Sequence, residues 1–564
     1  MSRKILVLLL LISGSLSAQE EFLSRNINHT SKNTIYPSIS GDGRTMIYLT
    51  DYTNTGEYGM EISEYKSGKW QDPKDLSALD PMRLNNTGGY FLDNSGEVIW
   101  FSSRKADGLG GFDIWYVRKG SSGWGRPINP GKPMNSTLDE GDPSISPDKQ
   151  EVYFMRCSRI SQDDAKGCKL YVSERNKGRG LPWKEPVELP GNVNVGNVLS
   201  PRILSDGRTL IFSSDRPGGK GGLDLWMTTR EGDTWTDPVN LSYANTPEDD
   251  RYMTMSLRTD YAYFTRVNDS GFKGIVQGYV PEQYRPGDVI MMMGKVVDDM
   301  GKPQSVDIRV NNLTKNRLDA RVISDEETGE FTAVLAEGSR FEITFEDRSG
   351  RLAFLTELRD IKELRGSRRE YPTVELTTVK SGAEFTIGGI AFDTLSATIT
   401  AESNFELLRL ARLIRQHGDL RFSIDVYQEN YREDSLQLPG LTEVRYDSVQ
   451  VYLPAIEVDS MANPEKDSLL AVMNDTLGMT LEDTVIANEY QARMGGVDSV
   501  EVWQRYAIYH NNRTPLYAQT LVQQLVSKGV GEDQVMVTAL GLIPDNKRDK
   551  VVFINGVAIV VRIE

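Results

Sequence analysis

Short apolar segments alternate with turn-forming residues along the first half of the chain, and this pattern repeats. Four copies of a Trp-x-x-Pro mark identify the repeat, and they begin at Trp70, Trp124, Trp183 and Trp235. Before each mark lies a turn rich in Gly, Asp, Asn or Ser, followed by an apolar strand. These strands are expected at residues 45–49, 98–101, 152–155 and 209–212. Strand, turn, strand and turn at this spacing predict the blades of a β-propeller.

We expect five blades, or six if the ends of the chain contribute further strands. A weaker fifth copy covers residues 252–279, and residues 22–34 are predicted to complete the last blade and close the ring. In two copies a Ser-Ser pair is followed by Gly-Gly-Phe-Asp or Gly-Gly-Leu-Asp, at residues 102–113 and 213–224. These phrases resemble the repeat of the TolB-like, WD-type propeller family. The resemblance implies a propeller over residues 19–286.

A different strand pattern follows residue 286. Strands are expected at residues 289–297, 306–310, 329–333 and 341–345, with Asp, Gly and Pro turns between them. Strands of this length over about 90 residues predict a small β-sandwich at residues 287–380. The segment resembles a carboxypeptidase-regulatory-like module, which in that family is structural and carries no catalytic residues.

From residue 385 onward, helices are expected among the strands. Strands are predicted at residues 387–392, 420–426, 534–540 and 551–561, and a helix at residues 515–528. An earlier helix is expected to bury an apolar face made of Phe405, Leu408, Ala411, Leu413 and Ile414. The opening Phe-Asp-x-x-Ser-Ala-x-Ile at residues 392–399 and this order of elements resemble the C-terminal peptidoglycan-binding domain of the OmpA family. The expected fold class is therefore multidomain and mainly β: a propeller, a β-sandwich and an α/β OmpA-like domain over residues 381–564.

The chain departs from the OmpA family at the residues that bind the cell wall. That family has Gly-His-Thr-Asp at the end of the second strand and an arginine in the following helix, and both grip the stem peptide. Here the motif position reads Val-Tyr-Gln-Glu, so that Glu429 remains as an acidic stand-in, and the arginine position is Tyr517. A tyrosine cannot form a bidentate pair with a carboxylate. Glu429 and Tyr517 are therefore predicted to be the remnant of a peptidoglycan site whose binding is lost or weak.

An acidic insertion occupies residues 431–510, where the OmpA family has a short loop. It carries 14 acidic and 5 basic residues, which is more than half of the chain's formal net charge of −16. Within it, Asp is followed by Ser or Thr and an apolar residue seven times, which resembles the O-glycosylation acceptor of the Bacteroidota. The hydroxyl residues that this resemblance marks are Ser435, Ser448, Ser460, Ser468, Thr476, Thr484 and Ser499. Two alternatives stay open: an acidic linker with drifted short repeats, and a small helical subdomain at residues 469–473 and 500–509.

The N-terminal residues and the two cysteines indicate an exported protein. Basic residues, a short apolar run and small residues up to Ala18 have the layout of a signal peptide over residues 1–18. No cysteine lies near the expected cleavage site, so a lipoprotein is not expected. Cys157 and Cys168 lie beside two predicted adjacent strands and are expected to form a disulfide across one hairpin, with two buried thiols as the alternative. The acidic balance argues against nucleic acid as a partner.

Catalytic motifs are absent from the sequence. The three histidines, His29, His417 and His510, are scattered, so neither a metal nor a cofactor is expected. Propeller glycosidases use paired carboxylates at the hub, and Asp113 and Asp224 are the candidates for that chemistry. Because both recur at equivalent blade positions, turn bonding is the favoured interpretation of these two residues.

The order of the three domains resembles the OmpA-family propeller proteins of the Bacteroidota, which include a periplasmic component of the type IX secretion system. The function expected from this resemblance is that of a non-enzymatic periplasmic scaffold, peripherally associated with the outer membrane. The expected partners are an outer-membrane barrel of the PorP/SprF type or secretion and gliding components. The alternatives are a peptidoglycan-anchored binding module for a small ligand or glycan, and a propeller glycosidase.

Overall fold

The computed structural model describes residues 20–564 except residues 52–57, 77–88, 121, 162–163, 177–181, 394–395, 434–437 and 455–498. The expected signal peptide lies outside the described residues. The protein is multidomain and mainly β, as predicted. Its contacts divide it into two compact units, one made of residues 1–346 and 358–376 and the other of residues 347–357 and 377–564.

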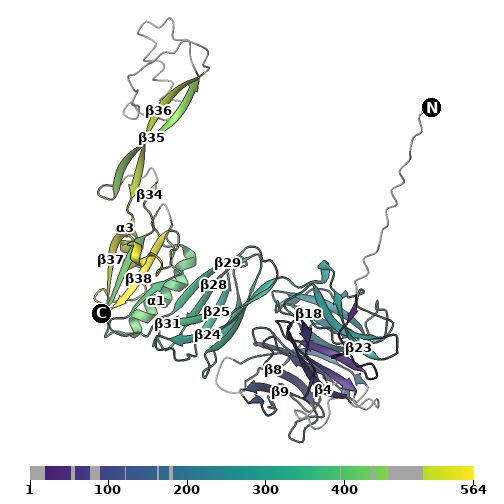
Figure 1. Ribbon diagram of the computed structural model, residues 1–564. Coiled ribbons are helices and arrows are strands. Elements are labelled where there is room, and N and C mark those ends of the chain that lie inside the picture. The colour runs from purple at the N-terminus through teal and green to yellow at the C-terminus, as the bar shows by residue number, and fades with distance from the viewer. Residues whose placement is uncertain are drawn as a thin grey trace, which may run out of the picture. The chain divides into compact units, whose positions relative to one another are not determined.

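The first unit begins with five small antiparallel sheets that form the propeller (Figure 1). The first blade contains β2 (Thr34–Ile39), β3 (Thr45–Asp51), β4 (Tyr58–Lys66), β5 (Lys69–Trp70) and β6 (Lys74–Asp75). The second contains β7 (Tyr90–Leu92), β8 (Val98–Ser103), β9 (Asp113–Gly120) and β10 (Gly123–Trp124). The third contains β11 (Asp139–Ile145), β12 (Glu151–Cys157), β15 (Lys169–Glu174) and β16 (Val187–Glu188), with a side hairpin of β13 (Arg159–Ile160) and β14 (Ala165–Lys166).

The last two blades complete the ring. The fourth blade contains β17 (Val198–Ile203), β18 (Thr209–Ser214), β19 (Asp224–Glu231), β20 (Thr234–Trp235) and β21 (Val239–Asn240). The fifth contains β22 (Tyr261–Val267) and β23 (Lys273–Tyr279), and the N-terminal strand β1 (Glu21–Phe22) pairs with β23. The chain start therefore closes the last blade, as the sequence predicted. Closure of this kind removes the free sheet edges that an open ring would leave.

The repeat has the role in the structure that its sequence pattern predicted. Each apolar segment expected before a Trp-x-x-Pro mark lies in the second strand of a blade: β3, β8, β12 or β18. The tryptophans of the marks lie at the outer edge, where Trp70 pairs with Tyr65 and Trp235 pairs with Arg230. Their spacing follows the blades because the first four blades each contain one mark.

A buried asparagine in each of three blades was not singled out by the sequence analysis. Asn135, Asn194 and Asn245 each accept a hydrogen bond from, and donate one to, the backbone of one residue in the third strand of a blade. The strand residues are Ile114, Leu170 and Leu225, and the distances are 2.7–3.1 Å. These pairs satisfy backbone groups that would otherwise be buried without partners. The sequence does mark these asparagines, because each one comes shortly before the first segment of the next blade.

The β-sandwich follows the short 3-10 helix η2 (Glu282–Tyr284) and lies in the first unit apart from residues 347–357. One sheet contains β24 (Val289–Asp298), β27 (Glu330–Ala336), β30 (Arg368–Glu370) and β31 (Thr373–Leu376). The other contains β25 (Asp307–Asn312), β26 (Arg317–Ile323), β28 (Ser339–Glu346) and β29 (Leu355–Ile361). The four predicted strands fall within β24, β25, β27 and β28. Phe331 and Phe345 meet edge to face between the sheets, with ring centroids 5.4 Å apart.

The second unit contains a four-stranded sheet with helices against one face. Its strands are β32 (Glu384–Ile387), β38 (Val557–Ile563), β33 (Phe422–Gln428) and β37 (Val535–Leu542), in that order. Its helices are η3 (Ala401–Ser403), α1 (Asn404–Gln416), α3 (Thr514–Ser527) and α4 (Asp545–Arg548). Among the described residues, no helix is long and apolar enough to cross a membrane.

Several expectations for this unit were wrong in detail. In α1, Phe405 and Leu408 are 69% and 43% exposed, and Leu407 and Leu410 enter the core in their place. The buried stripe runs through Leu407, Leu410, Ala411 and Ile414, which is the i, i+3, i+4, i+7 spacing of one helix face.

Two predicted strands have different limits. The first ends at Ile387 rather than at residue 392, because Gly388 packs so closely that a Cβ there would lie 2.3 Å from the carbonyl oxygen of Thr356. The last begins at Val557 rather than at residue 551.

The acidic insertion contains a long two-stranded ribbon, which neither alternative predicted. β35 (Thr442–Pro454) pairs along its whole length with β36 (Ser499–Asn511), and β34 (Arg432–Glu433) pairs with the end of β36. The helical alternative for residues 500–509 is therefore wrong, since these residues form a strand. Residues 469–473, the other part of that alternative, lie outside the described residues.

Candidate functional site at the hub of the propeller

Five residues, one from each blade, have a left-handed backbone at the same place in the repeat. They are Tyr36, Gly89, Asp142, Ser200 and Tyr252, with φ between 48° and 69°. In three blades the pairing of the first two strands is irregular at this position, as in a β-bulge. A bulge re-aims a side chain and is frequent beside functional sites. We refer to these five residues as the hub positions.

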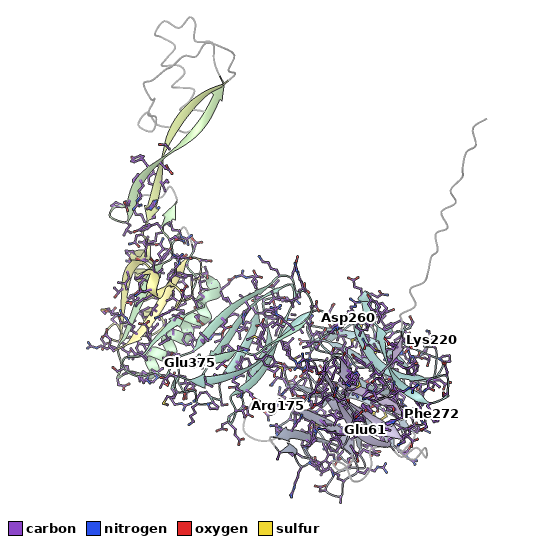
Figure 2. The ribbon with its side chains drawn as sticks, in the orientation of Figure 1. Glu61, Arg175, Lys220, Asp260, Phe272 and Glu375 are labelled. Atoms are coloured by element: carbon purple, nitrogen blue, oxygen red, sulfur yellow. A yellow bond between two sulfur atoms is a disulfide. The ribbon has the colours of Figure 1, made fainter. Side chains whose placement is uncertain are left out.

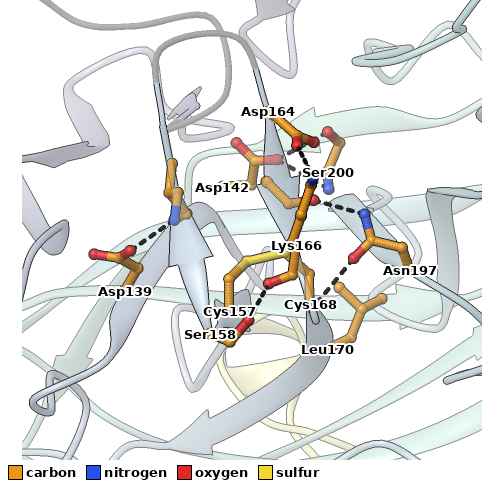
Figure 3. Close-up of a disulfide and its surroundings, with 12 residues drawn as sticks. Asp139, Asp142, Cys157, Ser158, Asp164, Lys166, Cys168, Leu170, Asn197 and Ser200 are labelled. Atoms are coloured by element: carbon orange, nitrogen blue, oxygen red, sulfur yellow. Dashed lines mark hydrogen bonds and ion pairs between the residues drawn. A yellow bond between two sulfur atoms is a disulfide. The ribbon is translucent and has the colours of Figure 1, made fainter.

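The hub positions converge on the carboxylate of Asp142. Its Oδ2 accepts hydrogen bonds from the backbone N–H and the hydroxyl of Ser200, at 2.9 and 2.8 Å (Figure 3). Its Oδ1 accepts a hydrogen bond from the hydroxyl of Tyr252 at 2.7 Å. A Cβ on Gly89 would lie 1.6 Å from the same oxygen, so only glycine fits there. Side chains far apart in the sequence thus meet around one acid.

A buried arginine lies in the same cluster. The guanidinium of Arg202 donates to the carbonyl oxygens of Tyr90 and Pro201, at 2.6 and 3.0 Å. It also lies over the ring of Tyr252, 5.1 Å from the centroid. Burial raises the pKa of Asp142, and the positive charge of Arg202 opposes part of that change. Burial likewise lowers the pKa of Arg202, which the Asp142 carboxylate opposes.

Tyrosines and further charged residues surround this acid. The rings of Tyr36 and Tyr252 have centroids 4.3 Å apart. Tyr36 and Arg251 are half-buried and interact electrostatically, as do Tyr36 and the exposed Asp249. Burial and then the Asp51 carboxylate raise the pKa of the neighbouring Tyr58 to about 12. We call Tyr36, Tyr58, Asp142, Arg251 and Tyr252 the hub cluster.

The sequence analysis missed the hub cluster although a signal was present. Tyr36, Asp142 and Ser200 are each followed by proline, a polar residue and isoleucine. The residue type before the proline therefore varies, while the proline and the isoleucine of this motif are constant. Such variation inside a repeat marks a position that every blade presents at the same place. This signal is less regular than the turn and tryptophan signals of the same repeat.

Asp113 and Asp224, the candidates for a glycosidase pair, have structural roles instead. Asp113 accepts hydrogen bonds from the backbone N–H groups of Leu109 and Gly110 in the preceding loop. Asp224 does the same for Lys220 and Gly221, at 2.9–3.1 Å. Both side chains are fully buried at the start of a third strand. This confirms the turn-bonding interpretation.

Cys157 and Cys168 form a disulfide, with 4.0 Å between their Cα atoms (Figure 3). The predicted hairpin is present, because Arg156 pairs with Lys169 in the register of β12 and β15. Both cysteines are buried. The bond closes the base of the side hairpin formed by β13 and β14, where Ser158 donates to the carbonyl oxygen of Lys166 at 2.8 Å.

Glu429 and Tyr517 do not form a binding site together. Tyr517 is fully buried, and its ring packs against Phe392 with centroids 4.6 Å apart. The carboxylate of Glu429 pairs with Arg548 at 3.0 Å. The position where the OmpA family has an arginine is therefore part of the hydrophobic core in this chain. That peptidoglycan binding is lost or weak stays a prediction.

Replacing Tyr517 with arginine is expected to destabilise the second unit by about 3–5 kcal/mol rather than to restore a site. The substitution would place an unpaired charge in the core. Tyr517→Phe is the matched control and should be near neutral, because the buried hydroxyl has no hydrogen-bond partner among the described atoms. Thermal unfolding measures both variants. An arginine variant as stable as the phenylalanine variant would contradict the buried position.

Only one of the predicted glycosylation residues can be placed with its side chain. Ser448 is exposed in β35, and its backbone N–H donates to the side chain of Asp447 at 2.8 Å. Ser499 begins β36. Ser435, Ser460, Ser468, Thr476 and Thr484 lie outside the described residues. Modification of these residues stays a prediction. In the parts of the chain that the structure describes, no three His, Cys, Asp or Glu side chains are grouped as a metal site requires.

Comparison with known proteins identifies the fold and no family. No protein-family model matches the chain, and no curated protein matches it. An α-L-arabinofuranosidase from Lactobacillus brevis is similar over 46% of this chain and 95% of its own, with 13% identity and a TM-score of 0.31. A GH62 hydrolase in complex with xylotriose is similar over 45% and 94%, with 11% identity and a TM-score of 0.29. A family 117 glycoside hydrolase from Zobellia galactanivorans is similar over 48% and 94%, with 9% identity and a TM-score of 0.27.

These comparisons contradict the expected function. We expected a non-enzymatic periplasmic scaffold, whereas several of the similar solved structures are glycoside hydrolases. The likeness concerns the fold alone, so what the hub does chemically must be argued from its own residues.

Proposed function

We propose that the propeller is directed at carbohydrate and that the hub cluster is its sugar site. The observation that carries this proposal is the grouping of Tyr36, Tyr252 and Arg251 around the buried acid Asp142, with Tyr58 beside Tyr36. Sugar rings present an apolar face and several hydroxyls, so aromatic rings beside a few fixed polar groups suit them. The hub cluster supplies both kinds of group, and every blade contributes a side chain to it or to its immediate partners; from the second blade, the Tyr90 hydroxyl donates to the carbonyl oxygen of Tyr36.

Hydrolysis of a glycosidic bond is the reaction that this chemistry supports. A carboxyl group whose pKa is raised by burial is suited to donate a proton to a leaving oxygen. Asp142 has that environment, although Ser200 and Tyr252 engage both of its oxygens. A second carboxylate is needed on the other side of the sugar, and the exposed Asp249, which interacts with Tyr36, is our candidate. One Asp249 oxygen accepts a hydrogen bond from the Leu223 N–H at 2.9 Å, which fixes the side chain.

A glycan array followed by measurement of released reducing sugar tests this proposal. The full chain should bind a defined set of glycans, and Arg251→Gln should weaken that binding by roughly tenfold, the effect of one lost charged hydrogen bond. Asp249→Asn should retain binding and lose at least a hundredfold in hydrolysis of a bound glycan.

Glu375→Gln is the control, because Glu375 is exposed in the sandwich (Figure 2). It should change neither property. Absence of glycan binding would refute the hub as a sugar site. Glycan binding without any release of sugar would refute hydrolysis and would identify the hub as a binding site only. A location in the periplasm and contact with peptidoglycan are further proposals that rest on the sequence alone.

A further inference from the structure

A second cluster lies where the second and third blades meet, away from the hub positions. The guanidinium of Arg118 lies 5.7 Å from the ring centroid of Tyr116, and that of Arg175 lies 4.8 Å from the ring of Trp183. Trp100 lies between the two rings, at 4.8 Å from Tyr116 and 6.0 Å from Trp183. These five residues form a continuous aromatic surface with a cation over each end. We call it the arginine–aromatic wall.

The wall lines a cavity of about 630 Å³ within the first unit. Strands β24 and β27 of the sandwich supply part of the opposite side through Met293, Lys295 and Thr332. Sites for small molecules usually have volumes of about 300–1,000 Å³, with apolar walls and a few polar groups. The cavity therefore has the size and the lining of a ligand site.

Acids near the two arginines interact with them through charge alone: Asp325 with Arg118, and Asp148 with Arg175. Among the described residues, neither Arg118 nor Arg175 has a carboxylate within ion-pair distance. Arg175 uses its Nε to donate to the carbonyl oxygen of Lys149 at 3.1 Å, and this bond orients the side chain. Within the part of the chain that the structure describes, its two terminal nitrogens remain available to a ligand. Burial lowers the pKa of Arg175, and the positive charge of Arg118 lowers it further. Two like charges held on one wall favour an anion between them.

We infer that the arginine–aromatic wall binds an acidic saccharide: the two guanidinium groups hold its carboxylate, and the rings contact the apolar face of the sugar. This site is separate from the hub cluster and does not depend on the function proposed there. The chemistry that the arginines recognise is an oxyanion, which a free phosphate ion also offers. The aromatic rings favour the sugar acid, because they can contact the apolar face of a sugar ring and a phosphate ion has no such face.

Calorimetric titration of the full chain with glucuronate, glucose and inorganic phosphate tests the inference, with tryptophan fluorescence as a second readout. Glucuronate should bind saturably and change the emission of Trp100 and Trp183, while glucose binds at least tenfold more weakly. Arg118→Gln and Arg175→Gln should each weaken glucuronate binding by roughly 10- to 100-fold, as expected for a lost charged hydrogen bond. Arg118 is exposed, so its substitution should not disturb folding. Arg175 is labelled on the propeller in Figure 2.

Arg159→Gln is the matched control, since Arg159 is exposed on the side hairpin and does not line the cavity. It should leave binding unchanged, and an equal loss in this variant would overturn the site as a specific one. Phosphate binding as tight as glucuronate binding, lost in the same two variants, would overturn the sugar and assign the arginines to a free anion. No saturable signal with glucuronate or phosphate would overturn the inference altogether.

Discussion

Replacing Asp142 with alanine is expected to lower the free energy of unfolding of the propeller by about 3–5 kcal/mol, because each buried donor left without its acceptor costs about 1–3 kcal/mol. The carboxylate accepts hydrogen bonds from Ser200 and Tyr252, and it offsets the buried positive charge of Arg202. Without it, three donor groups lose their acceptor and the guanidinium of Arg202 loses a nearby negative charge. Denaturant unfolding followed by tryptophan fluorescence measures the difference.

Asp164→Ala is the control for this prediction, because Asp164 is half exposed in the same blade and pairs with Lys166 at 3.1 Å. Exposed pairs contribute at most about 1 kcal/mol. A loss for Asp142→Ala no larger than for Asp164→Ala would contradict the described hub.

The stability contribution of Asp142 should also depend on pH. Burial raises its pKa in the folded state above the ordinary value of 3.8, so the folded protein binds this proton more tightly than the unfolded chain does. The part of this contribution that is linked to the proton is therefore full below pH 3.8 and is lost as the pH rises through the raised folded pKa, while the hydrogen bonds that the carboxylate accepts remain. Asp142→Asn does not titrate at this position. The stability difference between the natural protein and Asp142→Asn should accordingly shrink as the pH rises, and a difference that grows would reverse the assigned direction.

Removing the disulfide is expected to destabilise the propeller by about 3 kcal/mol, since it closes a short loop and limits the unfolded chain. Cys157 and Cys168 are 11 residues apart in the sequence and buried at the base of the side hairpin. The double substitution Cys157→Ser, Cys168→Ser should lower the melting temperature, as should reduction of the natural protein. Calorimetry measures the shift.

The reduced natural protein and the double serine variant serve as controls for each other. Both lack the bond, but only the variant places hydroxyls at the two buried positions. Similar losses in both would assign the effect to the bond itself. No change in melting temperature after confirmed reduction would show that the bond contributes nothing to folding.

The C-terminal unit shows how a resemblance in sequence can mislead about a site. The helix predicted at residues 515–528 is present as α3, and it contains Tyr517, the residue that the resemblance sets at the arginine position. Its tyrosine, however, packs against Phe392 in the core instead of facing Glu429. The order of elements survives such a change because it depends on the apolar pattern. The binding site does not survive it, because it depends on one side chain.

The sequence by itself determined the parts of this protein that local patterns encode. Turn residues and apolar runs placed the second strand of four blades, four strands of the sandwich and the cysteine pair, because each of these depends on neighbours within one repeat or hairpin. Only the tertiary structure decided the rest. Asp142 meets Ser200 and Tyr252, and Trp100 meets Trp183, across blade boundaries that no local pattern spans. The helix face of α1 and the ribbon of the insertion were decided in the same way, by partners distant in the chain. Both candidate sites therefore exist only once separate blades have packed against one another.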